Sequence, residues 1–297
     1  MLAREHLVTT GGGYNAMSAA ARQDMSVVYA GRLGTGPYSE IARTSLERDQ
    51  IVTPMEPSGD IDNGFCVVLL EEGGERTFIT SRGSEGTLRR SDLDALDVRP
   101  GDYVLVSGYN VMDLDMGGEV VRWLTQLPSG VVVAFDPSNR VLDIPTQLLE
   151  GVLVRCDWLL CNESEAAKLA GKSSPSQSST DLVARGARRG VVVRHGATGC
   201  TVALAGEPPV HVEGFATTVV DTNGAGDVHN GVFLAECAVG GDIIEAARRA
   251  NAAAALAIGV LGPASGPPKD VVTQWMHRQG QPVHRDNSGV GVAGDSL

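Results

Sequence analysis

The sequence predicts an α/β fold in which helices cover both faces of a doubly wound, mostly parallel sheet. Five short apolar runs without alternating polarity indicate strands that are buried on both faces. Amphipathic stretches separate most of these runs, and such alternation predicts right-handed βαβ units. The predicted strands cover residues 25–31, 102–108, 130–136, 157–162 and 190–196.

Helices are expected between these strands wherever apolar residues recur at the spacing of one helical face. The last of them is expected to be Ala-rich, over residues 248–258. A further strand is expected over 212–220, directly before a helix that begins near residue 227. The other predicted helices lie within 38–50, 117–127, 163–171 and 179–190.

One segment departs from this alternation and predicts a small second sheet. Residues 63–83 contain two β-rich runs around "EEGGE", a pattern typical of an antiparallel hairpin. We interpret it as a lid over the carboxyl ends of the parallel strands, where such sheets bind ligands; an edge ornament is the alternative. The predicted division is a main α/β domain (11–51 and 84–279), a β lid (1–10 and 52–83) and a disordered tail (280–297).

Composition and charge exclude several classes of protein. The net charge of −12 argues against a nucleic acid or an anionic membrane surface as the main partner. The longest apolar run, 250–262, is too short and too rich in alanine to span a bilayer. Five cysteines without a C-x-x-C pair argue against a disulfide scaffold or a zinc site. We therefore expect a soluble cytoplasmic protein.

The stretch "DTNGAGD" (221–227) carries the strongest chemical signal. Gly224, Ala225 and Gly226 stand where a turn opens a helix, and unpaired N–H groups at such a place form an anion site. Asp227 follows in the first helical turn. If the anion is a phosphate, this carboxylate can take a proton from an attacking hydroxyl. These residues alone do not distinguish that role from a simple helix cap.

The same stretch resembles the D-T-x-G-A-G-D signature of the ribokinase-like carbohydrate kinases, the pfkB family. Further family elements occur in the expected order along residues 9–268. The resemblance implies a ribokinase-like fold with a β lid, and a kinase that uses ATP and Mg²⁺. The other matching elements are "GGGYN" (11–15), "AFDPSNR" (134–140), "NESE" (162–165), "GVVVRHGATGC" (190–200) and "RRANAAAALAI" (248–258).

The resemblance assigns roles around the phosphates. Asp227 is the expected base, and Gly224, Ala225 and Gly226 are the expected anion hole for the γ-phosphoryl group. Glu165 is expected to hold Mg²⁺ through water, as suits an ion bound by few carboxylates; a helix capping box is the alternative for residues 162–165. Asp221 is implied beside a monovalent cation, K⁺. The expected nucleotide-binding residues are Asn162, Arg194, Gly196, Gly199, Asn223 and Asn251.

For the sugar, the resemblance implies Gly12, Gly13 and Asn15, together with two residues after the lid hairpin, Arg82 and Glu85. Arg82 would meet an acidic sugar such as 2-keto-3-deoxygluconate, whereas a solvent-exposed arginine is the alternative. A homodimer formed through the lid is also implied.

The largest departure from the family lies at the start of the chain. Few residues precede Gly11, and none matches the family's first strand or its sugar-binding aspartate. Without that strand, backbone groups of its neighbours would stay unpaired, so we expect a start upstream. Three functions stay open: a kinase for a primary hydroxyl of a ribose-, fructose- or 2-keto-3-deoxygluconate-like sugar, a nucleoside kinase, and an impaired sugar- or nucleotide-binding regulator. The first is favoured.

Overall fold

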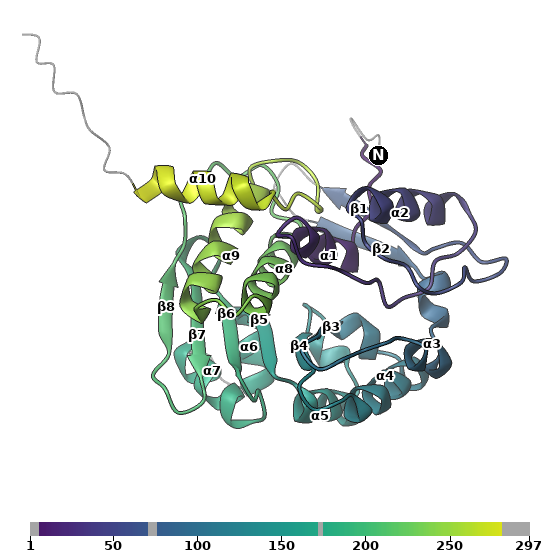
Figure 1. Ribbon diagram of the computed structural model, residues 1–297, viewed down its shortest axis with the longest axis horizontal. Coiled ribbons are helices and arrows are strands. Elements are labelled where there is room, and N and C mark those ends of the chain that lie inside the picture. Colours follow the sequence, from purple (N-terminus) through teal and green to yellow (C-terminus); the bar gives the residue numbers. More distant parts are fainter. Residues whose placement is uncertain (1–5, 71–75, 172–174, 281–297) are drawn as a thin grey trace, which may run out of the picture.

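A six-stranded sheet forms the centre of the computed structural model, which describes residues 6–70, 76–171 and 175–280 (Figure 1). Its first four strands run parallel, and the last two are antiparallel to their neighbours. This arrangement confirms the predicted α/β class. In spatial order the strands are β3 (Tyr103–Ser107), β4 (Val132–Asp136), β5 (Trp158–Asn162), β6 (Gly190–Arg194), β7 (Gly199–Leu204) and β8 (Val210–Glu213).

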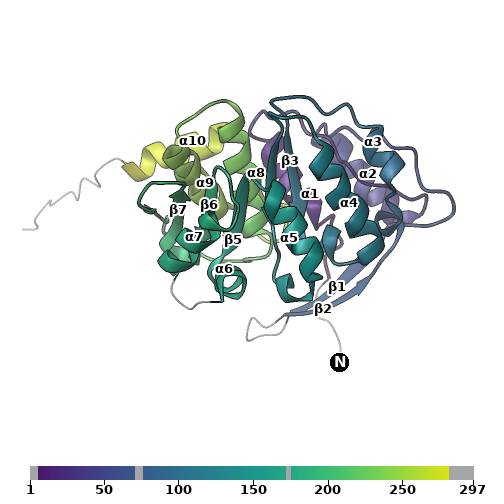
Figure 2. The same cartoon turned by 90° about the horizontal axis from the view of Figure 1, so that it is seen from below.

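Helices cover both faces of this sheet (Figures 1 and 2). One layer consists of α1 (Gly13–Ala21), α8 (Ala225–Ala238), α9 (Ile243–Ala257) and α10 (Lys269–Gly280). The other layer consists of α4 (Leu114–Gln126), α5 (Thr146–Arg155), α6 (Glu163–Ala170) and α7 (Pro175–Ala184). The remaining helices are α2 (Pro37–Arg48), α3 (Arg90–Asp94) and four short 3₁₀ turns, η1 (Ser84–Thr87), η2 (Gly108–Val111), η3 (Val141–Asp143) and η4 (Gly196–Thr198).

Successive strand residues enter two different cores, which explains why the apolar runs show no alternation in polarity. In β4, Ala134 packs in the cluster formed with α8 and α9, whereas Val133 and Phe135 pack in the cluster formed with α4 and α5. Trp158 of β5 meets Phe233 of α8 edge to face, with ring centroids 5.1 Å apart. Both faces of β4, β5 and β6 are therefore buried, whereas β3 at the edge of the sheet is only partly buried. No helix in the described ranges is long and apolar enough to cross a membrane.

Two strand predictions need correction. Residues 25–31 form only an isolated parallel bridge between Val28 and Val52, whose exposed fractions are 51% and 57%. Within the described residues, β3 pairs with β4 alone, so the apolar run finds no place in the large sheet. The strand expected over 212–220 ends at Glu213 with β8. An apolar run shows that a segment can form a strand, but not that a neighbour pairs with it.

The predicted second sheet is present. β1 (Phe65–Leu70) pairs antiparallel with β2 (Arg76–Ser81), separate from the large sheet (Figure 2). The connecting turn (71–75), the N-terminal residues 1–5 and the tail (281–297) lie outside the described residues. At the base of the hairpin, both the Gly64 N–H and the Gly83 N–H donate to the Glu85 carboxylate at 2.8 Å. One side chain therefore holds the two ends of the hairpin together.

Replacing Glu85 with alanine is expected to loosen the base of the lid. The variant loses a charged acceptor that serves two N–H groups, a contact that contributes about 1.5–3 kcal/mol. Hydrogen–deuterium exchange should become roughly tenfold faster in residues 64–70 and 76–83. Glu207→Ala, in the exposed turn before β8, is the control and should leave these rates unchanged. Equal rates in the Glu85 variant and the wild type would contradict the role of Glu85.

Candidate active site

The first turns of α1 and α8 meet at one place. Asn15 Nδ2, in the first turn of α1, donates to Asp227 Oδ2, in the first turn of α8, at 2.8 Å. The residues preceding these helices, Gly12 and Gly224, both have positive φ, and no described side chain caps either helix. First-turn N–H groups lack intrahelical acceptors, and helix N-termini favour anions. Two positive helix ends therefore adjoin one carboxylate.

Glycine is required at the turn that opens α8. Gly224 has φ +78°, and a Cβ atom there would lie 2.1 Å from the carbonyl oxygen of Pro263. A Cβ atom on Gly226 would lie 3.4 Å from Cζ of Arg194. The absence of side chains at Gly224 and Gly226 thus allows the turn to contact Pro263 on one side and the Arg194 guanidinium group on the other.

A second close approach sets the packing of the two helices. A Cβ atom on Gly231 of α8 would lie only 2.3 Å from the carbonyl oxygen of Ala16 on α1. Gly231 follows Asp227 by one helical turn, and Ala16 follows Asn15 directly. Our reading of the sequence did not identify Gly231. The available signal was a glycine inside a helical pattern, which indicates a packing constraint when it is not near an end.

The Arg194 side chain, at the end of β6, is 13% exposed and lies in a cluster of polar side chains. Its Nη2 atom lies 3.3 Å from Asp136 Oδ2 and 3.8 Å from Glu165 Oε2. Its Nη1 atom donates to Asn230 Oδ1, and Asn230 Nδ2 donates to Asp136 Oδ2 at 2.5 Å. The guanidinium group that the sequence predicts at the nucleotide is therefore also the partner of two carboxylates.

Asp136 and Asn230 are members of this cluster that our reading of the sequence did not assign to the site. Asp136 ends β4 within "AFDPSNR", and Asn230 lies about one helical turn beyond Asp227 on α8. A carboxylate at the end of a buried parallel strand is a signal for this position, since ligands of such sheets bind there.

The pKa of Asp227 is raised to about 6. Burial is the main cause, and the hydrogen bond from Asn15 opposes it. The carboxylates of Asp136 and Glu165 raise this pKa further, while Arg194 lowers it. A carboxylate with a pKa near neutrality is suited to act as a general base.

Asn162 and Glu165 form the capping box that was the alternative reading of "NESE". Asn162 Oδ1 accepts from the Glu165 N–H at 2.9 Å, and Glu165 Oε2 accepts from the Asn162 N–H at 2.8 Å. Burial, followed by the charge of Asp136, raises the pKa of Glu165. No group of three or more His, Cys, Asp or Glu suited to a metal occurs in the described part of the chain. The Mg²⁺ role of Glu165 stays a prediction.

The other expected nucleotide residues lie in two turns and one helix. Gly196 and Gly199 have positive φ in the turn between β6 and β7. Asn223 N–H donates to Asp221 Oδ1 at 2.9 Å, and Gly262 N–H donates to Asp221 Oδ2 at 3.2 Å. Asp221 thus joins the turn before α8 to the segment after α9. Its role at a cation stays a prediction.

Asn251 of α9 is buried and already makes contacts within the protein. Its Nδ2 donates to the carbonyl oxygens of Val212 and Glu213 at 3.0 and 3.1 Å, and its Oδ1 lies 3.2 Å from His229 Nε2. Burial lowers the pKa of His229 to about 3, so this histidine is neutral. Contact of Asn251 with adenine stays a prediction.

The expected sugar residues fall into two groups. Gly12, Gly13 and Asn15 lie together at the start of α1, beside Asp227. Arg82 follows β2 and is exposed, and the Glu85 carboxylate binds the base of the lid. The structure therefore brings the α1 group to the base, whereas sugar contacts of the two lid residues stay predictions.

Comparisons with known proteins find sugar kinases that are similar to most of the chain. Residues 3–270 match the model of a family described as pfkB family carbohydrate kinase. An uncharacterized sugar kinase of Escherichia coli (strain K12) is 29% identical over 281 residues, which cover 90% of this chain and 83% of that protein. An ATP-dependent ribose-1-phosphate kinase of Halopiger xanaduensis is 29% identical over 273 residues, covering 90% and 86%.

Solved structures confirm the predicted ribokinase-like fold. The crystal structure of a putative ribokinase II from E. coli with ATP and Mg²⁺ has a TM-score of 0.81 at 24% identity, covering 94% of this chain and 93% of that one. A Vibrio cholerae O395 fructokinase with fructose, ADP and calcium has a TM-score of 0.78 at 24% identity, covering 91% and 92%.

Replacing Arg194 with methionine is expected to destabilise the protein strongly. The change leaves Asp136 and Glu165 buried without their cation, which costs about 3–5 kcal/mol in the free energy of unfolding. Arg140→Met is the matched control, because the Arg140–Asp143 pair is exposed and contributes less than about 1 kcal/mol. Urea denaturation of both variants tests this difference. Equal losses would mean that the Arg194 cluster contributes no more than a surface ion pair.

Proposed function

The chain belongs to the pfkB family of carbohydrate kinases, and on that premise we propose that it transfers the γ-phosphoryl group of ATP to a primary hydroxyl of a small sugar. The expected acceptors are ribose-, fructose- or 2-keto-3-deoxygluconate-like. One observation carries the proposal: Asp227, a half-buried carboxylate with a pKa of about 6, lies where two helix N-termini meet. This geometry provides a base and an anion site side by side.

Asp227 acts as the general base in this proposal. Its carboxylate accepts the proton of the sugar hydroxyl while the hydroxyl oxygen forms a bond to the γ-phosphorus. The bond between that phosphorus and the bridging oxygen breaks, and ADP leaves with the electron pair. The N–H groups of the turn formed by Gly224, Ala225 and Gly226 stabilise the charge on the transferred group.

The residues around Arg194 fit a nucleotide with Mg²⁺. Arg194 offsets only part of the charge of Asp136, Glu165 and Asp227. The described carboxylates do not form a metal site by themselves, so the ion would be held chiefly by waters and substrate phosphates. Mg²⁺ is often held by few carboxylates, several waters and substrate phosphates, so Asn162 and Glu165 would orient its waters. When bound, Mg²⁺ neutralises charge on the phosphates.

The nucleotide itself would lie along the turns that follow β6 and precede α8. Arg194 would face its phosphates from behind Gly226. The remaining proposed contacts come from Asn223, Gly196, Gly199 and Asn251. Asp221 would hold K⁺; a related fructokinase structure contains potassium together with fructose and ADP.

The start of α1 fits a substrate rich in hydroxyl groups. Asn15 Oδ1 is buried and has no hydrogen-bond partner in the described part of the chain. Buried acceptors are nearly always satisfied, so a substrate hydroxyl is a suitable donor. No described heavy atom lies within 4 Å of a Cβ position on Gly12 or Gly13, which leaves room for a sugar. Arg82 and Glu85 are proposed to contact the sugar from the lid side.

The free cysteines and the negative net charge support a cytoplasmic enzyme that acts on a small molecule. All five cysteines are free, and four of them are buried, as suits a reducing compartment. The net charge of −12 is unfavourable for binding nucleic acid.

The pH dependence of turnover tests the role of Asp227. Because the base must be ionised, kcat/KM should rise with pH through about 6 and level off above it. Asp227→Asn should lower turnover about 10²–10⁴-fold with ATP affinity largely kept. A coupled ADP-release assay over pentoses, hexoses, keto-acid sugars and nucleosides measures both and identifies the acceptor.

Three outcomes would contradict the proposal. Unchanged turnover of Asp227→Asn would remove Asp227 from the mechanism. Binding of ATP without turnover on any acceptor would favour a regulator, and turnover on nucleosides alone would favour a nucleoside kinase.

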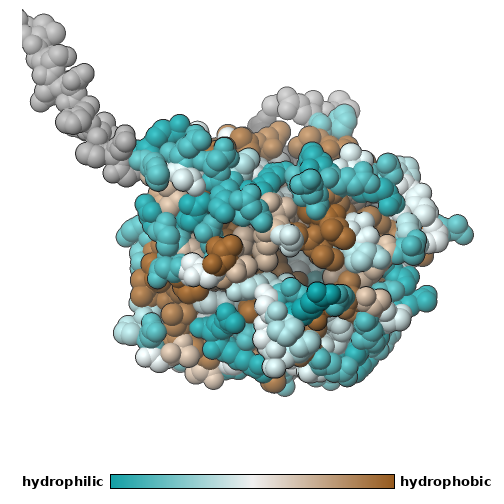
Figure 3. Space-filling view, viewed as in Figure 1, coloured by the Kyte–Doolittle hydropathy of each residue, from teal (hydrophilic) through white to brown (hydrophobic). Residues whose placement is uncertain are grey.

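We also propose that two copies associate through the lid. The two-stranded sheet exposes apolar side chains on both faces, and isolated two-stranded sheets are marginally stable in water. Hydrophobic patches interrupt the hydrophilic surface on the face that carries α1 and the lid (Figure 3). The exposed apolar residues of the lid are Phe65, Val67, Val68, Leu69, Phe78 and Ile79.

Sedimentation velocity tests this association. Ile79→Lys places a charge in the centre of the lid, opposite Val67, and should shift the equilibrium from dimer to monomer. Val239→Lys, an equally drastic change at an exposed position after α8, should leave the dimer intact. A wild-type protein that stays monomeric at all concentrations would contradict the proposal.

A further inference from the structure

We propose that Asn15 is a positioning residue for the base: its side-chain amide holds the Asp227 carboxylate in the orientation needed to receive the proton of the sugar hydroxyl. This inference rests on the proposed function, because it takes Asp227 as the base. Orientation of the Asp227 carboxylate is a role of Asn15 that is separate from binding the sugar.

The contact itself is short and shielded. Asn15 Nδ2 lies 2.8 Å from Asp227 Oδ2, and only 3% of Asn15 is exposed. A hydrogen bond to a charged acceptor is stronger than one between neutral groups, and burial strengthens it further. The amide therefore restricts rotation of the carboxylate.

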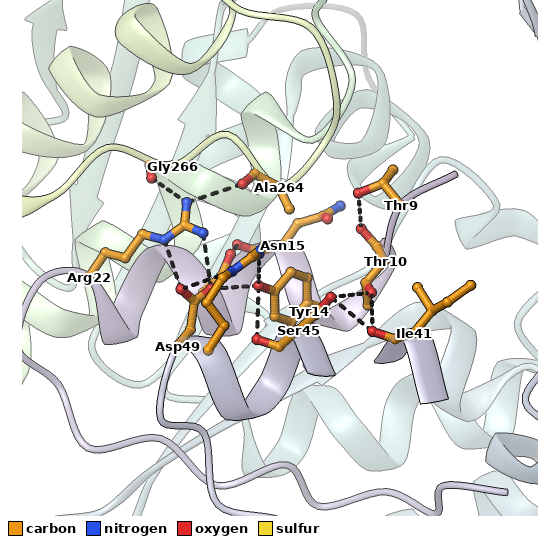
Figure 4. A network of polar contacts seen from close by, with 12 residues as sticks. Thr9, Thr10, Tyr14, Asn15, Arg22, Ile41, Ser45, Asp49, Ala264 and Gly266 are labelled. Atoms are coloured by element: carbon orange, nitrogen blue, oxygen red, sulfur yellow. Dashed lines mark hydrogen bonds and ion pairs between the residues drawn. The ribbon is translucent and has the colours of Figure 1, made fainter. Parts of the chain in front are cut away.

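Hydrogen bonds behind Asn15 hold α1 in place. The neighbouring Tyr14 hydroxyl donates to Asp49 Oδ2 at 2.5 Å, and the Arg22 guanidinium contacts the same carboxylate at 3.0 and 3.2 Å. Arg22 Nη1 also donates to the carbonyl oxygens of Ala264 and Gly266 (Figure 4). α1 is thus fixed to the end of α2 and to the segment before α10.

Packing of α1 against α8 holds the first turn of α1 from its other side. Gly231 allows the backbone of Ala16 to contact α8 directly. Asn15 therefore stands between two anchored neighbours, Tyr14 and Ala16. A functional group on a rigid element, supported in this way, keeps its geometry better than one on a loop.

Several charged groups and the hydrogen bond from Asn15 together set the pKa of Asp227. Asp136 from β4 and Glu165 from α6 disfavour the ionised form, and Arg194 from β6 favours it. Tyr109 from η2 also interacts with this carboxylate. Asn15 is the contact from α1, and its hydrogen bond lowers the pKa of Asp227. Removing the amide should therefore raise that pKa.

Two variants of Asn15 test the inference. Asn15→Leu keeps the volume and removes the donor, and Asn15→Ala suits the alanine-rich helix if leucine does not fold. In both, the acidic limb of kcat/KM should move to higher pH by about one unit, and kcat should fall. The pKa of Asp227 is also read directly by ¹³C NMR of labelled aspartate, with Asp227→Asn assigning the resonance.

The outcomes separate this inference from the proposed function. A higher Asp227 pKa in the Asn15 variants, together with the shifted limb, supports the positioning role. An unchanged Asp227 pKa by NMR overturns it, as does a raised KM for the sugar with an unshifted limb. A wild type without phosphoryl transfer to any acceptor overturns the proposed function, while the NMR titration still decides the role of Asn15.

Discussion

The close packing of α1 on α8 is the contact on which the site depends. Asn15 and Asp227 are 212 positions apart in the chain, and they meet because Gly231 lets the helix backbones approach. A side chain at Gly231 would separate the two first turns and the N–H groups that they present. The proposed anion site therefore depends on helix packing as much as on the glycine-rich turn before α8.

One largely shielded cation, Arg194, organises the second half of the site. Burial of an ion pair costs desolvation energy that attraction between the partners does not always offset. Three carboxylates with one guanidinium group are therefore a poor arrangement for stability alone. The arrangement is reasonable for binding, because a divalent cation that enters with a nucleotide offsets negative charge locally. Strained or costly electrostatics at a site are a common sign of function.

The sequence predicted what depends on local pattern and missed what depends on packing. Four of five buried strands followed from apolar runs, and Asp227 with its glycine turn followed from a specific motif. The run at 25–31 was mispredicted because pairing requires a neighbour that an apolar pattern does not specify. Asp136, Asn230 and Gly231 were missed because their partners lie far away in sequence. Asn162 and Glu165 form a helix capping box. The N-x-x-E pattern therefore has a structural role here whether or not it also binds Mg²⁺.

In the proposed mechanism, Asn15 contacts both the base and the sugar. Its amide nitrogen binds the base, and its oxygen is left as a buried acceptor without a partner in the described residues. Rotation of the amide to satisfy that oxygen would break the contact with Asp227. A hydroxyl-bearing substrate removes this conflict, because it supplies the missing donor while the nitrogen keeps its hold. In the mechanism that we propose, binding of the sugar and orientation of the base therefore favour each other through the Asn15 side chain.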